Sequence, residues 1–183
     1  MDTKDPLELE LAHRCRSNEP GAFDSLYDKY ADRVWRLCYR MVRNPADAED
    51  LAQEVWVKIW QRIGSFRGDS ALRAWLYRIA TNACLEWLRN KRRGPTYQTE
   101  IGNTYLADSR SDPEDRVLNA DKLKRLLDAV SALPIGLQLP LVLKVTEGLS
   151  YDEIAEALGC TVAAAKMRVS RARTALTKVM VQG

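Results

Sequence analysis

Apolar residues recur at intervals of three and four positions along most of the chain. Three such series precede residue 94: Phe23, Leu26, Tyr27, Tyr30, Val34, Leu37 and Met41; then Leu51, Val55, Ile59 and Ile63; then Leu72, Leu76, Ile79 and Ala83. This spacing places each series on one face of an α-helix. Because no segment alternates apolar and polar residues over the length of a strand, the pattern predicts an all-α fold.

Turn-forming residues mark the ends of these helices. Asn44 and Pro45 interrupt the first series, and Asp47, with acidic residues in the turn that follows, resembles a helix N-cap. Gly64 and Gly68 then bracket a short loop. The three series are therefore expected to form separate helices.

The segment 94–113 is polar, lacks helical periodicity and has glycine and proline at its ends. Loops of about 20 residues are uncommon inside one compact domain. We therefore expect two small helical domains, residues 1–93 and 114–183, joined by a flexible linker over 94–113. After the linker, the apolar spacing from Val117 to Val130 predicts a further amphipathic helix that ends at Pro134.

The stretch SYDEIAEALGCTVAAAKMRVSRAR, residues 150–173, has the spacing of a helix-turn-helix. Its glycine, Gly159, supplies the tight turn, because a glycine adopts positive φ without steric cost. The apolar face of the first helix contains Ile154, Ala155 and Leu158, and that of the second contains Val162, Ala165, Val169 and Leu176.

If that apolar face is buried, the opposite face of the second helix projects into solvent. Short side chains there allow close approach to a DNA major groove, and Arg171 is suited to a bidentate contact with guanine worth ~1–3 kcal/mol. Neighbouring cations are suited to phosphates. The alternative is an ordinary surface helix with basic residues near its C-terminal end, where the helix dipole favours them. The candidate DNA-binding residues are Ala163, Lys166, Met167, Arg168, Ser170, Arg171 and Arg173.

Charge is distributed in blocks along a chain whose composition, 46% apolar and 29% charged, is that of a globular protein. The net charge is −4 over residues 1–57, +7 over 58–93, −5 over 94–156 and +5 over 157–183. Two basic blocks separated by acidic ones indicate two polyanion-binding surfaces on two modules, with the acidic parts turned toward something else. The alternative is that each basic block is a solvated helix face.

Several classes of protein are excluded by what the sequence lacks. No run approaches the ~18 apolar residues of a membrane span, and the acidic N-terminus does not resemble a signal peptide, so we expect a cytoplasmic protein without membrane insertion. The four cysteines form no CxxC pair, and His13 with Cys15 supplies only two of the four ligands of a structural zinc site, so we expect no metal or other cofactor. A single histidine and the lack of a phosphate-binding glycine loop, an HExxH motif or a nucleophile elbow argue against an enzyme with a small-molecule substrate.

Three stretches gain meaning from their order: PADAEDLAQEVWVKIW, then FRGDSALRAWLYRIATNACLEWLR, then EGLSYDEIAEALGCTVAAAKMRVSRARTAL. Together they resemble the extracytoplasmic-function (ECF) group of bacterial sigma factors, in the sigma-70 family. The resemblance covers about residues 20–93 and 115–178. It implies two helical domains, region 2 and region 4, on a flexible linker. It also implies a protein without catalysis that binds core RNA polymerase, directs it to −35 and −10 promoter elements and assists promoter opening.

The resemblance assigns the acidic helix start to the polymerase. In this family that helix docks on basic clamp helices of the largest polymerase subunit. The residues that match are Asp47, Asp50, Leu51, Gln53 and Glu54.

The resemblance assigns the basic block 58–93 to the −10 element. Its loop matches the family segment that takes a base flipped from the non-template strand, and Phe66 offers a ring for stacking. Flipping costs a few kcal/mol, and aromatic stacking returns ~1–3 kcal/mol per base. The residues that match are Phe66, Arg67, Gly68, Asp69, Ser70 and Ala71 in the loop, Asn82 at the same site, and Arg73 and Arg78 on the strand backbone. We assign Trp75 to the core, because Leu72 and Leu76 share its helix face.

One segment departs from the family pattern. Residues 133–144, LPIGLQLPLVLK, carry Gly136 and Gln138 where the family commonly has cations. Pro140 lacks a backbone donor, and its ring clashes with the preceding turn at a cost of ~3 kcal/mol inside a helix. We therefore predict a short helix across Leu141 to Val145, with a start or a kink between Gly136 and Pro140.

The expected partners are core RNA polymerase, promoter DNA and an anti-sigma factor, because members of this group are commonly held inactive by one. The alternative is a helix-turn-helix regulator that binds an operator without polymerase. Such regulators usually dimerise to read two half-sites, and this sequence shows no clear dimerisation helix.

Overall fold

The computed structural model describes residues 5–93 and 125–181, and within these ranges the chain is helical and contains no strand. The all-α prediction is confirmed. The predicted linker 94–113 and the beginning of the helix predicted from Val117 lie outside the described residues. The elements are α1 (Pro6–Arg16), α2 (Ala22–Val42), α3 (Pro45–Arg62), a 3-10 turn at Ile63–Ser65, α4 (Leu72–Arg93), helical residues 125–132, α6 (Ile135–Val145), α7 (Tyr151–Leu158) and α8 (Val162–Val181).

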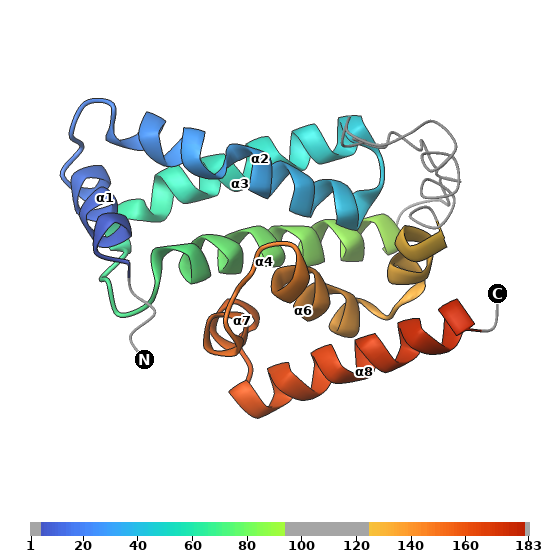
Figure 1. Ribbon diagram of the computed structural model, residues 1–183. Coiled ribbons are helices and arrows are strands. Elements are labelled where there is room, and N and C mark those ends of the chain that lie inside the picture. Colours follow the sequence, from blue (N-terminus) through green and yellow to red (C-terminus); the bar gives the residue numbers. More distant parts are fainter. Residues whose placement is uncertain (1–4, 94–124, 182–183) are drawn as a thin grey trace, which may run out of the picture.

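Helices α1, α2, α3 and α4 form the first of two groups of helices (Figure 1). Helices α2 and α3 run side by side in opposite directions, α4 crosses beneath them, and α1 closes one end. The turn between α2 and α3 is tight because Arg43 adopts φ +56° and Asn44 caps α3, its side chain accepting the Asp47 N–H at 3.0 Å. Asp47 is therefore not the N-cap that we predicted. Pro45 explains the earlier start, because proline is favoured at the first helical position.

The second group contains α6, α7 and α8. Ser150 and Glu153 form a reciprocal capping box at the start of α7, and Gly159 ends that helix with φ +60°. A left-handed residue at this point costs glycine little and reverses the chain into α8. The turn predicted at Gly159 is confirmed.

The predicted late start of the helix that contains Pro140 is wrong, and the alternative, a kink in that helix, stays a prediction. Helix α6 begins at Ile135, before the predicted interval, and Pro140 lies within it, buried. Its first turn closes when the Gln138 N–H donates to the Pro134 carbonyl at 3.0 Å. Pro140 leaves only the Gly136 carbonyl without its usual donor, and the burial of the apolar residues around it in α6 offsets that local loss.

Helix α4 is the member of the first group that faces the second: it packs against α2 and α3 on one side and against α7 on the other (Figure 1). One cluster of buried residues runs through the whole, with Leu37 and Tyr77 from the first group and Leu143 and Ile154 from the second. The sequence predicts separate domains; the described parts of both share this core. Cys15, Cys38 and Cys84 are buried and Cys160 is half-buried. None of the described helices has the length and apolarity to cross a membrane.

Candidate nucleic-acid interface

Helix α8 presents the face that its spacing predicts. Ala165 and Val169 are buried, with 0% and 1% of their surface exposed. Among the candidate residues, Ala163, Lys166, Met167, Ser170, Arg171 and Arg173 are exposed and Arg168 is half-buried. The helix carries five cations and no carboxylate, so the side chains on this face present positive charge to solvent. Contact with a major groove stays a prediction.

The loop between α3 and α4 surrounds a cavity of about 310 Å³, a size at the lower end for ligand pockets. Two cations, Arg67 and Arg78, lie in its wall beside the polar side chains of Asp69 and Ser70. One wall residue comes from the other helix group, namely Glu156 of α7. The full lining is Ser65, Phe66, Arg67, Asp69, Ser70, Trp75, Arg78 and Glu156.

Four residues of the predicted −10 site lie elsewhere. Gly68, with φ +75°, turns the chain beside Leu9 of α1, and Ala71 is buried at the start of α4. Arg73 points to α7, as described below, and Asn82 is exposed on α4 but does not line the cavity. The loop therefore combines wall-forming residues with residues that only shape the turn.

Phe66 differs from its predicted role. Only 3% of its surface is exposed, and its ring packs against Trp75 with centroids 5.5 Å apart. The ring lines the cavity but is packed on Trp75 and does not stand free for stacking. Trp75, the other ring of this contact, is half-buried, which agrees in part with its assignment to the core.

The face of α4 that follows the loop is covered by α7. Arg73 of α4 binds Glu153 of α7 through two nitrogens, with Nη2 2.7 Å from Oε2. Tyr77 donates to Glu147, and the Thr81 hydroxyl lies 3.4 Å from the Ala157 carbonyl oxygen. All three contacts link residues at least 70 positions apart in sequence, so no local pattern predicts them.

The pKa values of Glu153 and Tyr77 are shifted in opposite directions: that of Glu153 is lowered and that of Tyr77 is raised. Burial tends to raise the pKa of the Glu153 carboxyl, but the hydrogen bonds from Arg73 and Ser150 outweigh it and hold that pKa below its ordinary value. Burial and the hydrogen bond to Glu147 both raise the pKa of Tyr77. Glu153 is therefore an anion and Tyr77 a neutral donor at neutral pH.

The predicted polymerase-binding residues lie on or near one side of α3. Asp50, Gln53 and Glu54 are exposed, while Asp47 is half-buried and accepts from Lys91 at 3.1 Å. Leu51 is an exception, because only 2% of its surface is exposed. Its side chain belongs to the core cluster, and its contact with a partner stays a prediction.

An exposed apolar stripe continues this side of α3. Val57 and Trp60 are 54% and 57% exposed, and Trp60 meets the Phe23 ring edge-on at 4.7 Å. Large exposed apolar side chains beside polar ones often mark interaction surfaces. Trp60 is not among the residues predicted from the sequence, although its spacing of seven from Gln53 places the two residues on one stripe.

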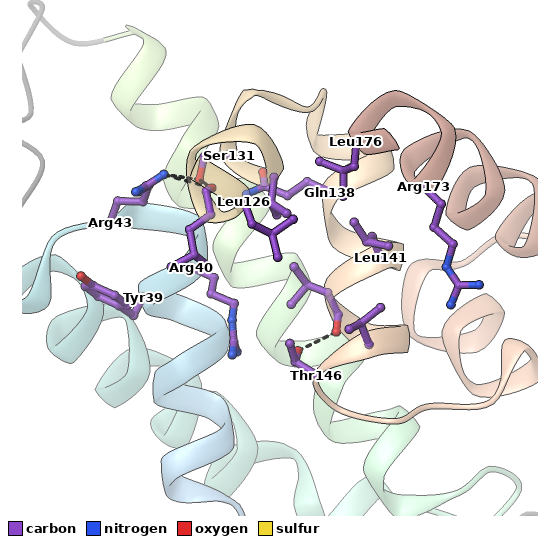
Figure 2. Close-up of a pocket in the computed structure, with 14 residues that line it drawn as sticks. Tyr39, Arg40, Arg43, Leu126, Ser131, Gln138, Leu141, Thr146, Arg173 and Leu176 are labelled. Atoms are coloured by element: carbon purple, nitrogen blue, oxygen red, sulfur yellow. Dashed lines mark hydrogen bonds between the residues drawn. The ribbon is translucent and has the colours of Figure 1, made fainter. Parts of the chain in front are cut away.

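A groove of about 430 Å³ lies where α2 meets α6 and α8 (Figure 2). Its walls are mainly apolar, and Arg40, Arg43 and Arg173 stand around it. Arg43 points toward Ser131, to which it donates a hydrogen bond. The apolar walls are Leu126, Leu127, Val130, Leu141, Val142, Val145 and Leu176, with Tyr39, Ser131, Gln138 and Thr146 between them. In the described residues no group of three or more His, Cys, Asp or Glu side chains is arranged to hold a metal ion.

Two family models match the chain and divide it as the helices do. The model of sigma-70 region 2 matches residues 26–94, and that of sigma-70 region 4 matches residues 123–176. The first contains the loop cavity and the second contains the helix-turn-helix. Together they cover most of the chain.

Curated relatives match over nearly the full length. The chain is 35% identical to the RNA polymerase sigma-H factor of Pseudomonas aeruginosa, covering 94% of this chain and 93% of the relative. It is 33% identical to the ECF RNA polymerase sigma factor SigW of Bacillus subtilis, covering 94% and 97%.

Solved structures show the same fold. CnrH, solved in complex with the cytosolic domain of CnrY, superposes with a TM-score of 0.72 at 23% identity and covers 96% of this chain and 97% of its own. The sigma factor RpoE of Bartonella quintana, solved in complex with the anti-sigma factor NepR, gives a TM-score of 0.72 at 24% identity, with 87% and 97% covered. Two family models in the expected order and full-length relatives above 30% identity lead to one conclusion: the chain belongs to the ECF sigma factors of the sigma-70 family, a family of non-enzymatic transcription initiation factors.

Proposed function

We propose that this sigma factor binds core RNA polymerase, directs it to −35 and −10 promoter elements and assists promoter opening in the cytoplasm. The observation that carries the proposal is the presence of two distinct basic surfaces, one on each matched region. Exposed Arg171 and its neighbours lie on α8, and Arg67 and Arg78 line a cavity between α3 and α4. A helix face suits a duplex major groove, and a cavity suits an extruded base.

For promoter opening, the cavity offers polar groups and aromatic rings in its wall. Asp69 and Ser70 are positioned to exchange hydrogen bonds with a base edge, and Arg67 and Arg78 to neutralise the strand phosphates. Phe66 and Trp75 offer that base an apolar contact surface. The protein then stabilises a base that has already left the duplex, which requires no catalytic residue.

For polymerase binding, the exposed side of α3 combines charge with apolar area. Glu54 and Gln53 supply polar contacts, and Trp60 supplies the aromatic anchor typical of interface hot spots. Trp60→Ala should weaken binding to core polymerase by about 30-fold, the effect of a ~2 kcal/mol hot spot. The change in thermal stability should be small, because Trp60 is 57% exposed. Titration of labelled protein with core polymerase measures the first effect and a thermal melt the second.

An anti-sigma factor is the third partner in the proposal. CnrH and RpoE, which share this fold, were each solved with a second protein, and RpoE's partner is an anti-sigma factor. The groove between α2, α6 and α8 has apolar walls that suit the apolar face of an amphipathic helix, and exposed Arg173 at its edge suits an acidic residue of that helix. A helix seated there touches both regions at once and holds them together.

Transcription from defined templates tests the proposal directly. Holoenzyme reconstituted from this chain and core polymerase should start at reproducible positions downstream of a −35/−10 pair selected from a random promoter library. Scattered start sites from the whole library would refute it. A footprint on an operator by the chain alone would instead favour the polymerase-independent regulator, which the family assignment does not favour.

A further inference from the structure

Three arginines of region 2 pair with three acids of region 4. Arg43 Nη2 lies 3.0 Å from Asp128 Oδ1, Arg40 Nη1 lies 3.7 Å from Glu147 Oε1, and Arg73 forms the two-nitrogen contact with Glu153. All three acids belong to the −5 block of the sequence. Three of the five described acids of that block therefore turn toward this chain's own cations.

The two contacts nearest α7 are well buried. Glu153 is 1% exposed and Glu147 is 6% exposed, and both carboxylates rest against α4 or α2. A buried carboxylate is tolerated only when its charge is paired and hydrogen-bonded. Such pairs add little net stability but specify one arrangement, because any other packing leaves the charge unpaired. The contacts of Glu147 and Glu153 therefore favour one position of α7 on α4.

This packing reaches part of the surface expected to meet the −10 strand, while Arg67, Arg78 and Asn82 stay exposed. Arg73, which is expected to bind the backbone of the DNA strand, donates hydrogen bonds from two of its nitrogens to Glu153. Glu156 adds a carboxylate to the wall of the loop cavity. Helix α7 contains Asp152, Glu153 and Glu156 and no cation, so it presents to α4 the charge that a nucleic-acid strand presents. A phosphate and the Glu153 carboxylate compete for the same guanidinium.

We propose that α7 is an intramolecular competitor for the −10 strand: in the free sigma factor its carboxylates occupy the strand-binding side of region 2, and separation of the two regions releases that side for DNA. The proposal rests on the proposed function of the loop cavity and Arg73. It assigns inhibition to the chain itself, before any second protein binds. Core polymerase, by holding the two regions apart, becomes the activator of single-strand binding.

Glu153→Gln tests the competition with least damage to the fold. Glutamine preserves the capping box with Ser150, since either Glu or Gln serves at that position, and removes only the charge that holds Arg73. Asp152→Asn is the matched control, because it removes one charge from the same first turn at an exposed residue. Glu147→Gln is a second, independent variant that weakens the contact between the regions, because it removes the charge paired with Arg40 and leaves the capping box untouched.

Two measurements on the full-length chain without polymerase are required. Fluorescence anisotropy with a short, labelled single-stranded DNA of random sequence measures strand affinity. Small-angle X-ray scattering measures whether the radius of gyration grows. We expect Glu153→Gln and Glu147→Gln each to raise strand affinity about tenfold, or ~1.4 kcal/mol, and to expand the particle. Asp152→Asn should change affinity less than twofold and leave the radius unchanged.

The outcomes separate the two proposals. Expansion with tighter strand binding supports the competition. Unchanged radius and affinity in both glutamine variants overturn it and leave the −10 function standing. Expansion without tighter strand binding also overturns it, and that result additionally counts against a strand-binding role for Arg73 and the cavity. Equal gains in Asp152→Asn attribute the effect to net charge alone and reject the competition.

Discussion

The two candidate DNA surfaces differ in how far each is open. On α8, Lys166, Arg171 and Arg173 face solvent on a helix without a carboxylate. On region 2, Arg73 is paired with Glu153 and Glu156 lines the loop cavity. Both surfaces come from basic blocks of similar charge, so a charge map predicts where a polyanion binds and not whether the site is free. Accessibility is a property of tertiary packing.

The largest expected effect comes from a substitution that tests whether Phe66 belongs to the core of region 2. Phe66→Ala should lower the free energy of unfolding by about 3–5 kcal/mol, because the ring is 3% exposed and packed on Trp75. Met167→Ala on the open side is the control, with an expected change within ~0.5 kcal/mol, because Met167 is 47% exposed. Urea denaturation followed by circular dichroism measures both. Equal, small losses would mean that Phe66 stands free for stacking.

The next effect concerns specificity on the open side. Arg171→Ala should change which −35 sequences the holoenzyme accepts, with ~1–3 kcal/mol lost at one base position. Lys178→Ala should weaken all promoters alike, because a phosphate contact carries no sequence information. Sequencing the promoters retained from a randomised library distinguishes them. Uniform losses for both variants contradict the assignment of Arg171 to a base.

The smallest effect is the pH dependence of the Arg73–Glu153 contact. The folded-state pKa of Glu153 lies below its ordinary value of 4.5, so its stabilising contribution is complete above about pH 4.5 and is lost as pH falls through the folded-state pKa. The titratable groups around the pair are Arg73 itself and, near Arg73, the Glu8 carboxyl and the Tyr30 phenol. Relative to Glu153→Gln, the wild type should be about 1 kcal/mol more stable at neutral pH and equally stable below the folded-state pKa.

Thermal melts of both proteins across that pH range measure the difference, and Asp152→Asn serves as a control with the same formal charge change. A gap between wild type and Glu153→Gln that persists unchanged into acid would show that the contact does not depend on the ionised carboxylate.

Local chemistry made much of this fold predictable. The apolar spacing in α2, α3 and α4 describes one helix at a time, and the turn at Gly159 needs only its own backbone preference. The outward face of α8 follows from the burial of Ala165 and Val169 on the other side. These features depend on residues within a few turns of one another.

The errors have a common physical origin in longer-range or competing effects. Asn44 caps α3 because Pro45 fixes the first helical residue, a preference that outweighs the acidic turn at Asp47. Pro140 is accepted inside α6 because packing outweighs one missing hydrogen bond. The position of Glu156 at the loop cavity depends on how two regions meet, which no helical period encodes.

Glu153 also binds the Ser150 backbone N–H, at 2.7 Å. When the regions part, this carboxylate keeps that internal donor and gains water, and the first turn of α7 remains capped. Under the proposed competition, α7 therefore leaves region 2 as an intact helix of the helix-turn-helix, without a refolding step.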